Sequence, residues 1–95
     1  MSFDLKFKME ALREWRALDN AIRDQFKRKL IERLSNPRIA AAKMSGQKDR
    51  YKIKLRTVGY RLVYEVRDAE LIVLVVAVGK RERNAVYLNA ARRQT

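Results

Sequence analysis

The sequence predicts an α+β fold in which two N-terminal helices pack on one face of a small antiparallel sheet of about four strands. Three patterns support this fold class. Polarity alternates over residues 3–7, as in a half-buried strand, and apolar residues then recur with helical spacing as far as residue 34. Three strand-like segments follow between residues 51 and 79. The expected element order is β-α-α-β-β-β-α, within a single domain of residues 1–95.

The first half of the chain predicts a strand followed by a helical hairpin. The strand at residues 3–7 should lie at a sheet edge or pair with a later strand. Residues 9–18 and 20–34 each present one apolar face with helical spacing. Asp19-Asn20 offers an N-cap between the two helices, and Pro37 follows the end of the second. Trp15 and Phe26 are expected in the core.

The second half predicts a three-stranded meander and a final helix. Residues 38–50 have no sustained period and should form a connecting loop with at most a helical turn. The strands are expected at residues 51–56, 60–67 and 71–79. Because residues 71–78 are all apolar, the last strand should be central and covered on both faces. A short helix is expected over about residues 83–93, with Val86 and Ala90 on one side.

The charge of the chain points to a polyanionic partner. Lys and Arg total 23 against 11 for Asp and Glu, so the formal net charge is +12. Apolar residues make up 47% of the chain, which is enough to build a core. The positive charge should therefore decorate a folded surface, where it repels itself until an anion covers it.

Several classes of function are disfavoured by composition. The chain has no Cys and no His, which removes disulfides, thiolate ligands, the commonest metal ligand and the commonest general base. It has no Gly-rich phosphate loop and no Ser-His-Asp set. Catalysis should therefore use Lys, Arg, Tyr or a carboxylate, with no metal and no cofactor. With no signal peptide and no apolar run long enough to span a bilayer, a cytoplasmic protein without a membrane partner is expected.

Cationic residues gather on one face of the predicted meander. In the strand at residues 51–56, Lys52, Lys54 and Arg56 share a face, while the apolar residues share the other. If Val58-Gly59 is a two-residue turn, the cross-strand pairs are Arg56 with Arg61, Lys54 with Val63, and Lys52 with Glu65. A different loop length would change this pairing. Continued alternation brings Arg81 to the same side, unless Gly79 bulges the last strand.

Such a cluster suits phosphodiester chemistry. Arg presents paired donors to phosphate oxygens and can stabilise the charge that develops at a pentacoordinate phosphorus. In RNA the 2′-hydroxyl can attack its own phosphate, so no metal-bound nucleophile is required. A Lys among like charges has a lowered pKa and can accept a proton, which makes Lys52 and Lys54 candidates. The alternative is a solvated basic strand that protects a sheet edge from aggregation.

Tyr87 also has two interpretations. It could stack on a base or hydrogen-bond the reacting region of single-stranded RNA. Periodicity alone equally allows an aromatic side chain that packs the final segment onto the sheet. The run Lys27-Arg28-Lys29 points in several directions around its helix, so a solvated face is expected there, with a weak contact to ribosomal RNA as the alternative.

Three sequence blocks together resemble the RelE family of bacterial toxins: residues 51–56 (YKIKLR), 59–64 (GYRLVY) and 78–83 (VGKRER), followed by Val86-Tyr87. Trp15 and Ser35-Asn36-Pro37-Arg38 stand in matching places, so the resemblance covers nearly the whole chain. It implies a small antiparallel sheet with two N-terminal helices and a short C-terminal helix.

The resemblance also implies an activity and partners. Relatives of this kind are ribosome-dependent endoribonucleases that cleave mRNA in the ribosomal A site, contacting ribosomal RNA and leaving a cyclic phosphate. A RelB-like antitoxin is implied as the inhibitor, wrapping around the domain and displacing the C-terminal helix. Operator DNA is implied as a partner only through the antitoxin complex, which would regulate its own transcription.

Residue by residue, the resemblance assigns proton transfer and charge stabilisation to Lys52 and Lys54, and the scissile phosphate to Arg61. Arg81 would stabilise the phosphate or leaving group, and Tyr87 would order the substrate nucleotide. Further RNA contacts are expected from five residues: Lys43, Lys48, Arg56, Lys80 and Arg83. One departure is Ser45 before Gly46, where close relatives have a basic residue. Either one RNA contact is missing here, or Lys43 or Lys48 supplies it.

Two other functions are compatible with a similar fold or charge. Toxins of the ParE kind share the fold but inhibit DNA gyrase, and those relatives lack the set of cations and Tyr87 described above. A non-catalytic RNA-binding module would use the same cations only to hold phosphates.

Overall fold

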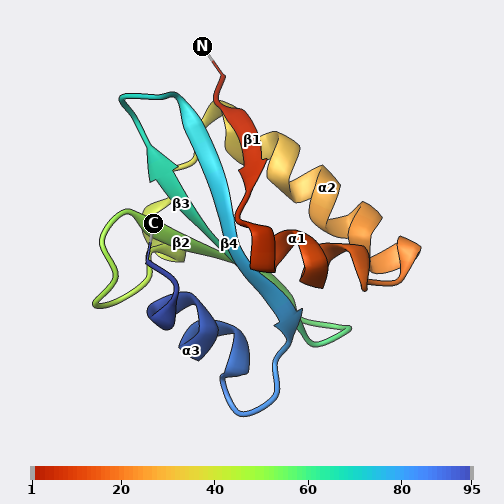
Figure 1. The fold of residues 1–95 in the computed structure, drawn as a ribbon. Helices are drawn as coiled ribbons and strands as arrows, with labels where there is room; N and C mark the ends of the chain where they lie inside the picture. The colour runs from red at the N-terminus through yellow and green to blue at the C-terminus, as the bar shows by residue number, and fades with distance from the viewer. Residues whose placement is uncertain (1, 95) are drawn as a thin grey trace.

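A computed structural model describes residues 2–94 and contains three α-helices and one four-stranded sheet (Figure 1). The elements follow the order β1 (Asp4–Phe7), α1 (Met9–Arg16), α2 (Asn20–Ser35), a 3-10 turn (Ala40–Ala42), β2 (Arg50–Leu55), β3 (Tyr60–Arg67), β4 (Ile72–Lys80) and α3 (Ala85–Arg92). The predicted α+β class and element order are confirmed. None of the helices is long and apolar enough to cross a membrane, among the residues described.

The strands lie in the order β1-β4-β3-β2. β1 is at an edge, as the sequence allows, but it runs parallel to β4, while the β2-β3 and β3-β4 pairs are antiparallel. The expectation of a purely antiparallel sheet is therefore wrong. The alternation in residues 3–7 identifies a half-buried strand but carries no information about its direction. A parallel pair needs a long crossover, and the whole stretch from α1 to β3 supplies it here.

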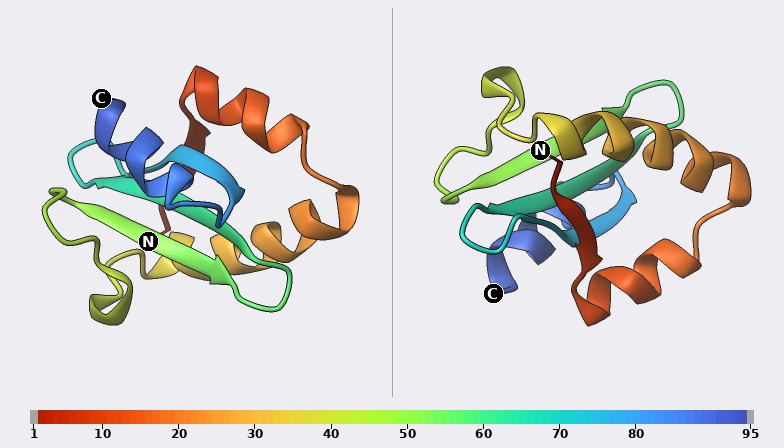
Figure 2. Two further views of the ribbon diagram at one scale, coloured as in Figure 1. Left: turned by 90° about the horizontal axis from the view of Figure 1, so that it is seen from below. Right: turned by 90° about the horizontal axis from the view of Figure 1, so that it is seen from above.

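The α1-α2 hairpin covers one face of the sheet and α3 covers the other, as the right view in Figure 2 shows with α2 in front of the sheet and α3 behind it. On the hairpin face, Trp15 and Phe26 belong to the main core, as predicted. On the opposite face, Val86 and Ala90 of α3 are buried, which confirms the expected inner side of that helix. Asp19 is the N-cap of α2, although its side chain makes no capping hydrogen bond.

β4 is the central strand that its apolar sequence predicts. It pairs with β1 on one side and β3 on the other, and it packs against both α1 and α3. Val75 faces the hairpin core, whereas Val76 and Ala77 belong to the α3 cluster. The register shifts here, since Tyr64 pairs with Val75 but Val63 pairs with Ala77. This bulge leaves Val76 as an extra residue, and after it Gly79 pairs with Arg61.

The β2-β3 hairpin differs from the expected register. Residues 56–59 form a longer turn, in which the Gly59 amide donates to the Leu55 carbonyl oxygen at 2.9 Å and Gly59 has a φ of +72°. The observed pairs are Lys54 with Arg61, Lys52 with Val63, and Arg50 with Glu65. The two-residue turn and its pairs are therefore wrong. The slip is two residues, which keeps every side chain on its predicted face because side chains alternate with a period of two.

Candidate active site

Strands β2 and β3 place two cations directly opposite each other on the α3 face. Lys54 pairs with Arg61, and the neighbouring Lys52 pairs with Val63, which is fully buried beneath α3. Like charges at directly opposed positions of a sheet destabilise it. The fold therefore maintains an unfavourable pair that an anion between the side chains would relieve.

Arg61 is the most buried of the candidate residues. Its exposed fraction is 4%, and its Nη1 donates to the Tyr60 carbonyl oxygen at 2.9 Å. No residue in the described part of the chain accepts a hydrogen bond from its Nε. A buried guanidinium with an unmet donor costs stability, and the surrounding strands hold it in one place.

Arg81 follows β4 and is attached to the start of β3. Its backbone amide donates to the Gly59 carbonyl oxygen at 2.7 Å, and Lys80 just before it pairs with Tyr60. The side chain of Arg81 is exposed and lines a shallow hollow with Val58 and Gly59 at this end of the sheet. Arg81 and Arg61 are thus held at neighbouring positions by the same strand pairing.

The electrostatic surroundings of Lys54 link these residues into one cluster. The pKa of Lys54 is lowered from its ordinary value by the charge of Lys52 first, then by partial desolvation, and then by the charges of Arg56, Arg61 and Arg81. A lowered pKa increases the fraction of neutral amine at a given pH, which is the form that accepts a proton. Lys52, Lys54 and Arg56 also line a hollow of about 310 Å³ along the edge strand β2.

Tyr87 shares a second groove with Lys52, separate from the hollow that Lys52 and Lys54 line. It is half-buried on α3 and lines a groove of about 420 Å³, whose wall includes Lys52, Met44, Asn84 and Leu88. Lys52 therefore borders both this groove and the hollow that contains Lys54. The arrangement leaves an aromatic ring at the edge of the cationic cluster, where a flat ligand could contact both.

The five additional residues proposed for RNA contact are more dispersed. Arg56 is exposed in the β2-β3 turn, while Lys80 and Arg83 are exposed around the segment between β4 and α3. Lys48 is exposed in the loop before β2. The ammonium group of Lys43 lies 5.4 Å from the ring centroid of Tyr51, a residue of the hairpin-face core.

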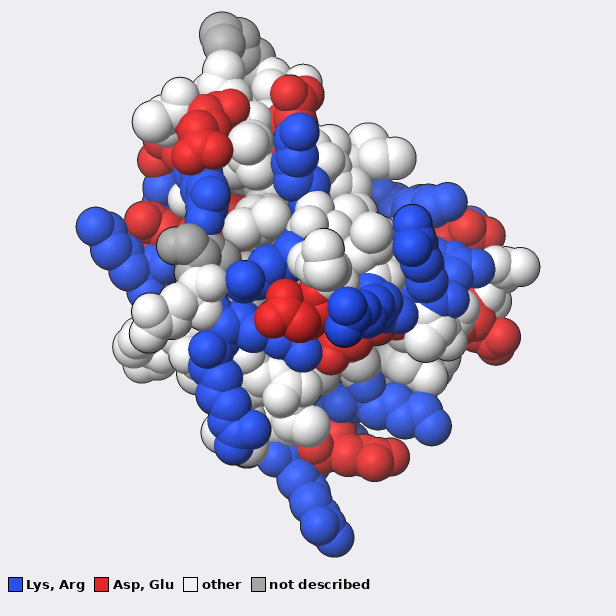
Figure 3. Space-filling model, in the orientation of Figure 1, with Lys and Arg blue, Asp and Glu red and all other residues white. Residues whose placement is uncertain are grey.

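Figure 3 shows the distribution of charge on one face of the molecule. Lys and Arg side chains are spread over the left, centre, right and lower parts of this face, and Asp and Glu side chains lie in smaller groups near the top, at the centre, on the right and near the bottom. Within residues 2–94, no group of three or more His, Cys, Asp or Glu side chains is arranged to hold a metal ion.

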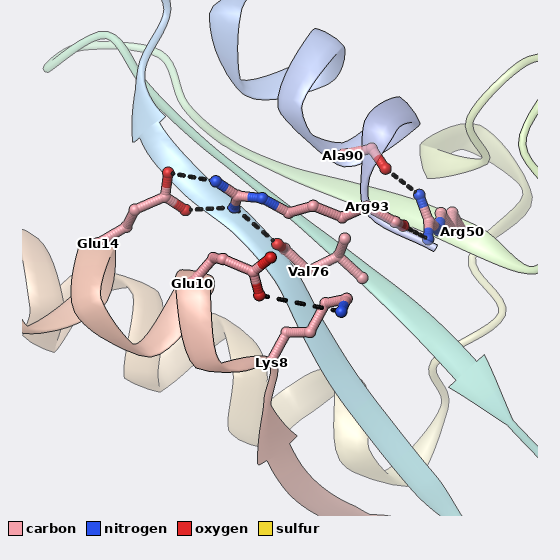
Figure 4. A network of polar contacts seen from close by, with 7 residues as sticks. All are labelled: Lys8, Glu10, Glu14, Arg50, Val76, Ala90 and Arg93. Atoms are coloured by element: carbon pink, nitrogen blue, oxygen red, sulfur yellow. Dashed lines mark hydrogen bonds and ion pairs between the residues drawn. The ribbon is translucent and has the colours of Figure 1, made fainter. Parts of the chain in front are cut away.

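Sequence reasoning missed a polar network that joins β2, the end of α3 and α1, drawn in Figure 4. Arg50 is 7% exposed and contacts the end of α3, and Arg93 contacts Glu14 of α1. Arg50 was assigned to the end of a loop, but it begins β2. Extending the alternation back by two residues from Lys52 would have placed it on the α3 face.

Comparison with known proteins defines the class. Residues 5–85 match the family model described as the ParE toxin of the type II toxin-antitoxin system parDE. The mRNA interferase toxin RelE of Escherichia coli (strain K12) is 53% identical over 93 residues, covering 98% of each chain. Among solved structures, an E. coli RelE toxin with two arginine-to-alanine substitutions in the free state has a TM-score of 0.92 at 49% identity, covering both chains completely. The same mutant toxin in complex with the antitoxin peptide RelBc gives a TM-score of 0.83 at 49% identity, again over all of both chains.

The fold and these matches define a toxin of a type II toxin-antitoxin system. Within that class, the chain belongs to the RelE family, which confirms the resemblance carried by residues 51–56, 59–64 and 78–83.

Proposed function

We propose that this chain is an mRNA interferase that cleaves mRNA in the ribosomal A site and so inhibits translation. The observation that carries the proposal is the Lys54-Arg61 pair, whose neighbours Lys52, Arg56 and Arg81 lower the pKa of Lys54. A fixed cationic cluster with a Lys that can lose its proton is suited to metal-independent attack within RNA. The identity to mRNA interferase RelE over nearly the whole chain supports the same activity.

In the proposed reaction, the 2′-hydroxyl of a nucleotide attacks the adjacent phosphorus. The new 2′-O–P bond forms as the bond to the 5′-oxygen of the next nucleotide breaks, which leaves a 2′,3′-cyclic phosphate. Neutral Lys54 takes the 2′-hydroxyl proton, with Lys52 as the alternative base. Arg61 and Arg81 bind the phosphate oxygens and stabilise the charge on the pentacoordinate phosphorus. A protonated neighbour in the cluster supplies a proton to the leaving oxygen.

Tyr87 would order the substrate nucleotide by stacking. Its ring lines the groove next to Lys52, so a base resting on it would place its own phosphate toward the cations. Arg56, Lys80 and Arg83 would contact neighbouring phosphates, and Lys43 and Lys48 would contact RNA farther from the reacting bond.

The partners follow from the same relatives. We infer that a RelB-like antitoxin binds this chain, since a relative at 49% identity forms a complex with an antitoxin peptide. The inhibitor would displace α3 and with it Tyr87. Operator DNA would be bound only through the toxin-antitoxin complex, and the protein would act in the cytoplasm on ribosome-held mRNA.

The experiment is a purified translation reaction in which mRNA 5′ ends are mapped. The wild-type protein should produce cuts within the A-site codon, and Arg81→Ala should lose about 100-fold or more in single-turnover rate with little change in ribosome binding. Arg13→Ala is the matched control, because it removes an exposed arginine of α1 outside the cluster. Loss of ribosome affinity in Arg81→Ala without loss of the chemical step would instead support a non-catalytic RNA-binding module.

A gyrase-inhibiting activity of the ParE kind is the second candidate. It is favoured by the description of the matching family model, whose match ends at residue 85 and does not reach Tyr87. DNA supercoiling by purified gyrase discriminates between the two candidates. Inhibition of supercoiling without any mRNA cleavage would favour this second function.

A further inference from the structure

Helix α3 carries Tyr87 but has little stability of its own. It is eight residues long, and isolated helices of this length are not stable in water. Its N-cap residue, Asn84, has a left-handed backbone conformation and makes no side-chain capping hydrogen bond. The side chains it buries against the sheet, Val86 and Ala90, are small. Contacts outside the helix must therefore contribute to its position.

Arg50 holds the C-terminal end of α3. Its guanidinium donates to the carbonyl oxygens of Ala90, in the last turn of α3, and of Arg93, the residue that follows the helix. The Nε of Arg50 also donates to Glu65 at 3.1 Å, and Nη1 donates to the Gln47 side chain at 3.0 Å. A buried cation at a helix C-terminus interacts favourably with the helix dipole. Arg50 is thus fixed by β3 and the preceding loop while it binds α3.

Arg93 ties the same end of α3 to α1. It donates to both carboxylate oxygens of Glu14, at 2.7 and 3.1 Å, and to the Val76 carbonyl oxygen at 3.0 Å. Glu14 in turn accepts from the Val78 amide at 3.3 Å. β1 pairs with β4 only as far as Val75, so this ion pair occupies the backbone groups where the β4 edge is left open (Figure 4). The pKa of Arg93 is raised, chiefly by its hydrogen bonds to Glu14.

We propose that Arg50, Glu14 and Arg93 form a polar latch that positions Tyr87 for the reaction by holding α3 on the sheet. The three residues act through α3 and do not touch the RNA, so they are positioning residues. The inference rests on the proposed function, because it gives α3 its role at the reacting RNA. It predicts that loosening the latch reduces cleavage without altering Lys54, Arg61 or Arg81.

Hydrogen exchange measures the latch independently of activity. In Arg50→Met and in Arg93→Gln, the α3 amides that bond within the helix should exchange about tenfold faster or more, while the amides of β3 and β4 keep their wild-type protection. Glu14→Gln should loosen α3 to a smaller degree. If Arg50→Met does not fold, Arg93→Gln and Glu14→Gln carry the test, because both of these side chains are less buried than Arg50.

Two matched controls remove the same charge without touching α3 contacts. Arg67→Met removes the other arginine that binds Glu65, and Arg92→Gln removes the exposed arginine next to Arg93. Neither substitution should change α3 exchange or the cleavage rate by more than about twofold, since neither breaks a latch contact.

Single-turnover cleavage then tests the positioning role. Arg50→Met should lose roughly 10- to 100-fold in rate, because small misplacements of a substrate-ordering group are costly. In a Tyr87→Ala background the same substitution should cost less than about twofold, since residues acting through one group are not additive. Unchanged α3 exchange in every latch variant, or a full multiplicative loss in the Tyr87→Ala background, would overturn the proposal. If the wild-type protein does not cleave mRNA, the proposed function fails, and the exchange measurement alone decides whether the latch exists.

Discussion

Lys54 on β2 lies directly opposite Arg61 on β3, so the β2-β3 hairpin holds two like charges in a cross-strand pair. The pKa of Lys54 is lowered first by the charge of Lys52, then by partial desolvation, and then by the charges of Arg56, Arg61 and Arg81. Such a pair costs the free protein stability and becomes favourable when a phosphate lies between the two side chains.

Replacing Lys54 by Met should stabilise the free protein. The folded-state pKa of Lys54 is lowered, so the unfolded chain binds its proton more tightly. This residue therefore opposes folding fully at pH values below its folded pKa, and the opposition is lost as the pH rises from the folded pKa through the unfolded pKa. Lys54→Met removes that opposition at neutral pH. Thermal unfolding at low salt should show a higher Tm for the variant, and the difference should shrink as salt screens the cluster. A Tm below that of the wild type would contradict this account.

The pH dependence of cleavage should follow the neutral fraction of Lys54. Because Arg56 is among the charges that lower its pKa, Arg56→Gln should raise the pKa of Lys54. In a plot of the single-turnover cleavage rate against pH, the rising part of the curve should then move to higher pH, and the plateau rate should change less. Arg67→Gln is the charge-matched control, and it should leave the rising part in place. A rising part that does not move in Arg56→Gln would argue against Lys54 as the base.

Arg61→Met should separate catalysis from stability. The Arg61 side chain is buried with an unmet donor at Nε, so an apolar residue of similar length should change the free energy of unfolding by less than about 2 kcal/mol. Cleavage should nevertheless fall by about 100- to 1,000-fold, because a preorganised donor to the developing charge is lost. Urea unfolding and single-turnover kinetics on the same sample provide both quantities. A variant that is strongly destabilised, or that cleaves at the wild-type rate, would refute this assignment.

Two substitutions distinguish the roles left open for Tyr87. Stacking needs only the ring, so Tyr87→Phe should keep the rate within about threefold, while Tyr87→Ala should lose about 10- to 100-fold. If the hydroxyl group took part in the reaction, both variants would be equally impaired. Circular dichroism should confirm that both variants fold, since Tyr87 is only half-buried.

The sequence predicted those features of the fold that depend on hydrophobic periodicity. The helical spacing of Trp15 and Phe26 identified core residues, and the apolar run in residues 71–78 identified the central strand. The direction of β1 was not predictable, because alternation looks the same in parallel and antiparallel strands. The register of the β2-β3 pair was predicted wrongly, because the length of the turn at residues 56–59 depends on the backbone geometry at Gly59.

The candidate site was predictable to the extent that it depends on strand faces. Lys52, Lys54 and Arg61 stayed on one face despite the error in pairing, because the slip was an even number of residues. The contacts of Arg50, Glu14 and Arg93 were missed, because they join residues far apart in the chain. Strand alternation could have given the face of Arg50, but not its partners on α3. The place of Lys43 was not predictable either. Lys43 precedes the loop glycine Gly46, and its ammonium group lies over the ring of Tyr51, a residue of the hairpin-face core.

The most direct test of the central claim uses an mRNA with a single 2′-deoxynucleotide at the position cut in the all-ribose message. If the cluster around Lys54 and Arg61 promotes attack by the 2′-hydroxyl, the wild-type protein on programmed ribosomes will cut the all-ribose message to a 2′,3′-cyclic phosphate and leave the deoxy-substituted bond intact. Cleavage of both messages at similar rates would contradict the account.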